Sequence, residues 1–143
     1  PSMFEQFVVR YVREMTQLIH EHGARVRLHS HGKIGRVLEM IAATGVDALD
    51  PIEAPPDGDV SLAEVKRVLG GRMCLFGNVQ LKLLEHGTPQ QVRAVVRGCM
   101  EEAKAGGGFV LMPTAAPINT PLSPQTQRNY MEYIEAALDY GRY

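Results

Sequence analysis

The sequence contains no tryptophan and only two cysteines, Cys74 and Cys99, among its 143 residues. The two cysteines are not in a Cys-x-x-Cys spacing, and each lies inside an apolar stretch. This pattern argues against a secreted protein held together by disulfides. It predicts two buried free thiols in a reducing compartment, the cytoplasm.

Basic clusters and long apolar runs are also missing. The 15 Lys and Arg residues nearly balance the 16 Asp and Glu residues. We therefore expect neither nucleic acid nor an anionic membrane as a partner. No apolar run approaches the roughly 20 residues that a membrane-spanning helix needs, and no signal peptide is visible. The length predicts a single domain segment over residues 1–143.

Stretches with helical spacing alternate with short apolar stretches along the whole chain. Helices are predicted to begin near residues 2, 33, 61, 88 and 123, and strands to cover 25–29, 46–50, 72–78 and 106–112. Thr88 and Ser123 are each followed by proline, the usual combination of an N-cap and a first helical residue. Ser2 with Glu5 matches the capping-box pattern.

Strands separated by helices of this length imply parallel pairing with right-handed crossovers. Two architectures meet this requirement: an open three-layer α/β sheet and half of an eight-stranded (β/α) barrel. In the first predicted strand Val26 and Leu28 alternate with Arg27 and His29. A strand buried between two helical layers is apolar throughout, so the alternation favours the barrel. We therefore predict an α/β fold of the (β/α)8 TIM-barrel type, with four βα units in this chain.

Half a barrel leaves unpaired strand edges, which natural proteins avoid. We therefore expect a missing N-terminal half, or a second copy of the chain, to complete the barrel. The start at Pro1 leads us to favour a cropped chain over a natural half-barrel.

Functional side chains of parallel α/β folds gather at the carboxyl ends of the strands. His29 and His31 stand two residues apart at the first strand end, on the same side, and Glu53 follows the second strand. Two imidazoles and a carboxylate with one open position form a catalytic metal site. The alternative is that the histidines bond loop backbone and that Glu53 is a solvated acid.

Two asparagines follow the other two strands. Asn78 comes after Gly77 at the third strand end, and Asn119 lies in the proline-rich loop after the fourth. Each is a candidate for contacting a small-molecule substrate. For Asn78 the alternative is to satisfy backbone groups in the turn.

Six segments, in order along the chain, resemble the C-terminal half of the uroporphyrinogen decarboxylase superfamily. They are LHSHG, GVDALDPIE, LFGNVQ, HGTPQQV, AGGGFVLMP and the final YGRY. That superfamily contains the porphyrinogen decarboxylases and the cobalamin-dependent methyltransferases. The resemblance implies a (β/α) barrel of which this chain supplies the last four units.

The methyltransferase branch carries zinc at this strand end through His-x-Cys and a later cysteine. Zinc there activates a thiol such as coenzyme M, and a corrinoid donates or accepts the methyl group. His29 matches the family histidine, whereas His31 occupies the cysteine position and the region of Ala115 and Ala116 has no thiol. A zinc site with altered ligands remains chemically sound, since two histidines and a glutamate also bind zinc.

The decarboxylase branch uses no cofactor and has Gly-His-Gly after the last strand, where this chain has MPTAAP. The leading expectation is an enzyme of metal-assisted methyl transfer, and the alternative is uroporphyrinogen decarboxylation in porphyrin biosynthesis. A non-catalytic half-barrel serving in assembly is a further alternative. A metal-dependent amidase also places His-x-His at a barrel strand, but the later strand ends here lack histidine.

Overall fold

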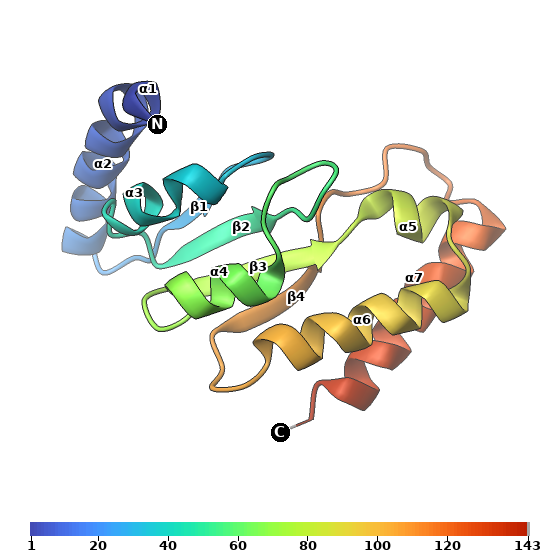
Figure 1. Ribbon diagram of the computed structural model, residues 1–143. Coiled ribbons are helices and arrows are strands. Elements are labelled where there is room, and N and C mark those ends of the chain that lie inside the picture. The colour runs from blue at the N-terminus through green and yellow to red at the C-terminus, as the bar shows by residue number, and fades with distance from the viewer. Residues whose placement is uncertain (143) are drawn as a thin grey trace.

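The computed structural model describes residues 1–142; Tyr143, the last residue of the YGRY segment, lies outside them. Four parallel strands form one sheet in the order β1-β2-β3-β4 (Figure 1). They are β1 (Arg27–His29), β2 (Ala48–Ile52), β3 (Cys74–Val79) and β4 (Phe109–Pro113). The helical elements are α1 (Ser2–Phe4), the π-helical η1 (Glu5–Val9), α2 (Arg10–Glu21), the 3-10 turn η2 (Gly35–Val37), α3 (Leu38–Ala42), α4 (Leu62–Leu69), α5 (Leu81–His86), α6 (Pro89–Ala103) and α7 (Pro124–Tyr140).

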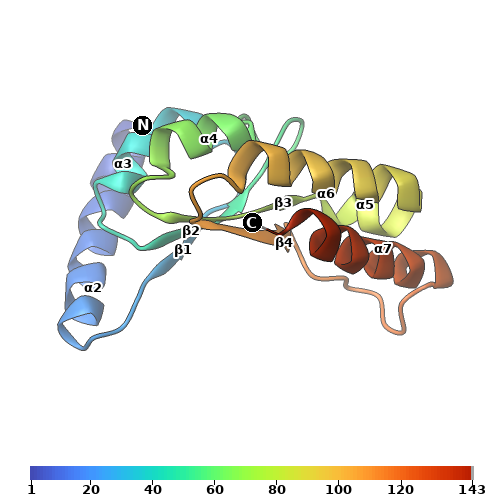
Figure 2. The same cartoon turned by 90° about the horizontal axis from the view of Figure 1, so that it is seen from below.

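The helices cover one face of the sheet. Figure 2 shows α3, α4, α5 and α6 on the same side, with α2 beside the β1 edge and α7 beside the β4 edge. No helix of residues 1–142 lies across the opposite face. A parallel sheet with alternating helices and one open face is half of a (β/α) barrel, so the predicted fold class is confirmed.

The register of the strands explains which face is covered. Leu28, Leu49 and Leu75 are register neighbours, and the last two are fully buried against the helices. Fully buried partners come from three helices: Ile41, Val65 and Val96. Burying a side chain of this size contributes about 1.5–3 kcal/mol. Side chains alternate along a strand, so Arg27 and His29 lie on the face without helices.

Three local expectations differ from the structure. The second strand runs through Pro51 to Ile52 instead of ending at Asp50, because the ladder is irregular between Leu49 and Ile52 and needs no proline N–H there. Pro1, not Ser2, is the N-cap of the first helix. Helix α5 was not expected from the pattern.

No helix in residues 1–142 has the length and apolarity to cross a membrane.

Candidate active site at the carboxyl ends of the strands

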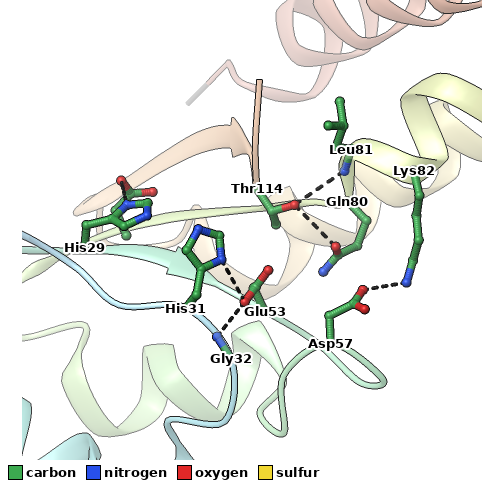
Figure 3. A network of polar contacts seen from close by, with 10 residues as sticks. His29, His31, Gly32, Glu53, Asp57, Gln80, Leu81, Lys82 and Thr114 are labelled. Carbon is green, nitrogen blue, oxygen red and sulfur yellow. Dashed lines mark hydrogen bonds and ion pairs between the residues drawn. The ribbon is translucent and has the colours of Figure 1, made fainter. Parts of the chain in front are cut away.

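The chain beyond β1 stays beside β2. The Ser30 N–H donates to the carbonyl of Asp50 at 2.7 Å, and Gly32 then turns the chain with a φ of 83°. Only glycine adopts that left-handed conformation without strain. As a result His31 lies beside the end of β2, close to His29 (Figure 3).

His29 pairs with Asp50, its register neighbour on β2. Nδ1 of the ring lies 3.1 Å from Oδ2 of Asp50, and Nε of Arg27 lies 3.6 Å from the same oxygen. Asp50 is only 3% exposed, and its Oδ1 has no partner in residues 1–142. The Arg27 guanidinium also stacks over the Phe76 ring at 5.1 Å. Arg27 therefore fixes the carboxylate from the open face.

His31, two residues after His29, is also paired with a buried carboxylate. Its Nδ1 lies 3.2 Å from Oε2 of Glu53, and the same oxygen accepts a hydrogen bond of 2.6 Å from the Gly32 N–H (Figure 3). Glu53 is 7% exposed. The two histidines are thus each held by a different buried carboxylate.

The two imidazoles form a close pair. Their ring centroids are 4.6 Å apart in an edge-on arrangement, and the side chains are 60% and 50% exposed. Within residues 1–142, no group of three His, Cys, Asp or Glu side chains is placed to hold a metal ion. Both rings contact their carboxylates through Nδ1, and imidazole nitrogen suits zinc. Metal ligation by these histidines and Glu53 stays a prediction.

Neither predicted asparagine has a hydrogen bond to the histidine pair. Asn78 accepts a hydrogen bond from Sγ of Cys99 on α6 at 3.1 Å and lines a hollow of about 610 Å³ between α4, α5 and α6. Burial raises the pKa of the Cys99 thiol to about 11. Asn119 lines a different hollow with Glu85 and Ser123. Their contact with substrate stays a prediction.

A second polar network ties the ends of β3 and β4 together. The Thr114 hydroxyl donates to Oε1 of Gln80 at 3.3 Å and accepts from the Leu81 N–H at 3.4 Å (Figure 3). Nε2 of Gln80 is buried without a partner in the described part of the chain. Lys82 forms an ion pair with Asp57 nearby. The polar groups of this edge therefore come from all four strand ends.

Two residues of the site, Asp50 and Arg27, were not among those predicted. The signal for Asp50 was its place at a strand end, one strand over from His29. The signal for Arg27 was its alternation with Leu28 on the side of His29. Asp50 and Arg27 could be recognised as neighbours of His29 only once the strand register was known.

A half-barrel with its polar side chains concentrated at the carboxyl ends of parallel strands defines part of a (β/α) barrel of the type that carries active sites at that edge. Comparison with known proteins identifies the family. The model of the uroporphyrinogen decarboxylase (URO-D) family matches residues 1–136, and the chain belongs to this family.

Curated relatives support the assignment over most of the chain. The uroporphyrinogen decarboxylase of Pseudoalteromonas translucida is 33% identical over 113 residues, which are 77% of this chain and 30% of the relative. That of Cupriavidus necator is 35% identical over 110 residues, 75% of this chain and 29% of the relative. The chain therefore spans about 30% of the length of these relatives.

A solved structure of similar fold is a methyltransferase from Methanosarcina mazei. The TM-score is 0.76 at 22% sequence identity, and the match covers 99% of this chain and 38% of the methyltransferase. At this identity the likeness shows the fold alone. The remaining part of that chain has no counterpart in the present one.

Proposed function

We propose that this chain carries the metal site of a URO-D family methyltransferase that transfers a methyl group with metal assistance. The observation that carries the proposal is the pair of neighbouring imidazoles, each held through Nδ1 by a buried carboxylate at the carboxyl ends of the strands. The name of the Methanosarcina mazei structure, a methyltransferase, agrees with this choice. The donor or acceptor of the methyl group is proposed to be a corrinoid.

The residues of this chain would bind the metal ion and orient its ligands. His29 and His31 would hold zinc through Nε2, and zinc would supply Lewis acidity that lowers the pKa of a bound thiol. Glu53 would complete the set in one of two ways. It would be a third ligand after releasing His31 and Gly32, or it would remain the anchor of His31 that it is in this structure. Asn78 and Asn119 stay candidates for contacting substrate.

Metal analysis of the purified protein tests this proposal. We expect close to one equivalent of zinc per chain and its loss in the double variant His29→Ala/His31→Ala. His86→Ala is the matched control, because that histidine is exposed and outside the pair. Less than about a tenth of an equivalent in the unmutated protein would contradict a metal site of this kind. Methyl transfer from methylcobalamin to a thiol is the accompanying assay.

The open face of the sheet supports a further part of the proposal: complementary βα units complete the barrel. Large apolar side chains of α2 and α7 are more than two-fifths exposed at the two sheet edges: Tyr11, Met15, Leu18, Met131, Ile134 and Leu138. These units would come from another part of the same polypeptide or from a second copy of this chain. Light scattering of the isolated chain distinguishes the two, since a stable dimer indicates a second copy and a monomer indicates the same protein.

The alternative function is decarboxylation of uroporphyrinogen without a cofactor. It is favoured by the names of the curated relatives, which are decarboxylases at about one-third identity. Against it stands the segment after β4, which has no histidine. Release of carbon dioxide from uroporphyrinogen that is unaffected by a chelator would support this alternative over metal-assisted methyl transfer.

A further inference from the structure

We infer that Asp50 and Glu53 are positioning residues that hold His29 and His31 as their Nδ1–H tautomers, so that Nε2 is the nitrogen each ring offers to a ligand. The identity of that ligand as a metal ion rests on the proposed function. The tautomers do not, because the contacts that set them lie within the chain.

The first half of the inference depends on Asp50. A carboxylate oxygen only accepts hydrogen bonds, so its contact of 3.1 Å with Nδ1 of His29 places the hydrogen on that nitrogen. Arg27 holds the same oxygen from the open face, and Asp50 is almost fully buried between strands. The position of Asp50 is therefore imposed by the sheet, and it dictates how the more exposed ring of His29 is turned.

The second half depends on Glu53, whose Oε2 contacts Nδ1 of His31 at 3.2 Å. The Gly32 N–H donates to that oxygen, which ties the carboxylate to the turn that carries His31. Gly58 packs directly on the Glu53 backbone, where an added Cβ would lie 1.9 Å from the carbonyl oxygen. Glu53 is thus held from two sides before any ligand arrives.

These contacts assign the carboxylates a role outside the ligand set. Nδ1 and Nε2 point to opposite sides of an imidazole ring, so a carboxylate that stays paired with Nδ1 of His31 is not placed to ligate a metal held at Nε2 of that ring. Histidines that bind metals commonly donate their other N–H to a carboxylate, which fixes the tautomer and the ring orientation. Asp50 supplies such a partner to His29 through a hydrogen bond, and Glu53 lies at ion-pair distance from Nδ1 of His31.

The decisive measurement needs no variant and no metal. Long-range nitrogen–proton NMR of the metal-free protein at alkaline pH distinguishes the two neutral tautomers of each histidine. We expect Nδ1–H for His29 and His31. Nε2–H as the main tautomer of both rings would overturn the inference, whatever the protein binds.

Variants then connect the tautomers to binding. Asp50→Ala removes the acceptor, and we expect His29 to lose its preference for Nδ1–H while His31 keeps it. Asp50→Asn keeps a carbonyl oxygen and is expected to restore part of that preference. Zinc affinity, measured by competition with a chelator, should fall about 10- to 100-fold in Asp50→Ala and in Glu53→Ala. Asp57→Ala is the control, since that carboxylate pairs with Lys82.

The outcomes separate this inference from the proposed function. The expected tautomers without zinc binding support the positioning roles and overturn the metal site alone. If Glu53→Ala abolishes zinc binding but leaves the tautomer of His31 unchanged, Glu53 is a ligand and its positioning role is overturned. Unchanged tautomer and unchanged zinc affinity in Asp50→Ala overturn the role of Asp50.

Discussion

The two ends of the sheet each place a histidine beside an aspartate, and the two pairs differ in how completely the aspartate is satisfied. At the amino ends Asp47 accepts hydrogen bonds from three donors: Nε2 of His20 at 2.7 Å, Nη1 of Arg25 at 2.8 Å and the Val26 N–H at 2.7 Å. The Val26 N–H, followed by His20 and Arg25, holds the pKa of Asp47 well below its ordinary value. Both oxygens of Asp47 therefore have hydrogen-bond partners.

At the carboxyl ends Asp50 is more deeply buried than Asp47 and yet less satisfied. One oxygen meets His29 and Arg27, and the other has no partner within residues 1–142. A buried polar atom without a hydrogen-bond partner lowers the stability of the folded state, so such atoms are uncommon in folded proteins. The contacts of Asp47 therefore stabilise the fold. At Asp50 the unpartnered Oδ1 is itself buried, and the group of this cluster that solvent reaches is the ring of His29.

The largest expected contrast, in zinc affinity and in stability, is between alanine variants of His29 at the carboxyl ends and His20 at the amino ends. His29→Ala should weaken zinc binding by more than about 100-fold, beyond the range for a residue that only orients a ligand. Its stability should change little, because the side chain is mostly exposed. His20→Ala should do the reverse, with lower stability and unchanged zinc affinity. Chelator competition and thermal unfolding measure the two effects, and equal loss of zinc in both variants would contradict the comparison.

The cysteines extend the comparison to thiol reactivity. Cys74 begins β3 at the amino end and is partly exposed, whereas Cys99 is buried beside Asn78. Burial raises the pKa of both thiols, that of Cys99 to about 11. At pH 8 only about one Cys99 in 1000 is then a thiolate, so Cys74 should be alkylated at least about tenfold faster. Mass spectrometry of the time course checks the order, and faster labelling of Cys99 would show that its helix opens readily.

The hydrogen bonds to Asp47 predict how the stability of the protein depends on pH. The folded pKa of Asp47 lies below the unfolded value of about 3.9, so its contribution is complete above that value and is lost as the pH falls below it. Asp47→Asn should lower the free energy of unfolding at neutral pH by more than loss of a helix cap does. The variant should also lose less stability on acidification than the unmutated protein. Urea unfolding from neutral to acid pH tests this, and parallel curves would contradict it.

The smallest expected effect comes from a polar residue whose hydrogen bonds cap a helix. Thr88 begins α6 with a complete capping box, its hydroxyl accepting from the Gln91 N–H and the Gln91 side chain accepting from the Thr88 N–H. Thr88→Ala should cost about 1 kcal/mol of stability and leave zinc affinity unchanged. Ser2→Ala should cost nothing measurable, because Pro1 is the cap there. A loss in Ser2→Ala equal to that in Thr88→Ala would contradict the observed caps.

Much of the fold followed from local spacing. The helical and alternating periods predicted all four strands, and the alternation of Leu28 with Arg27 and His29 favoured the half-barrel over an open three-layer sheet. The errors lie where tertiary structure overrides a local rule. Pro51 was expected to end a strand, but the irregular ladder beside β3 removes the need for its N–H.

The candidate site was predictable as a place and less so as a set of contacts. The rule for strand ends selected His29, His31 and Glu53. It did not reveal that Asp50 holds His29 or that Asn78 is bonded to Cys99 on a helix. Parity along one strand does not say which residue of the next strand lies opposite, and that depends on register and on irregularities in the ladder.

The order of helices and strands, and with it the parallel half-barrel, was already present in the sequence, because periods of 3.6 and 2 are properties of neighbouring residues. The pairing of each imidazole with its own carboxylate arose only in the folded chain. His29 and Asp50 are 21 positions apart, as are Gly32 and Glu53, and only the packing of a helix onto the sheet between them brings those groups to bonding distance.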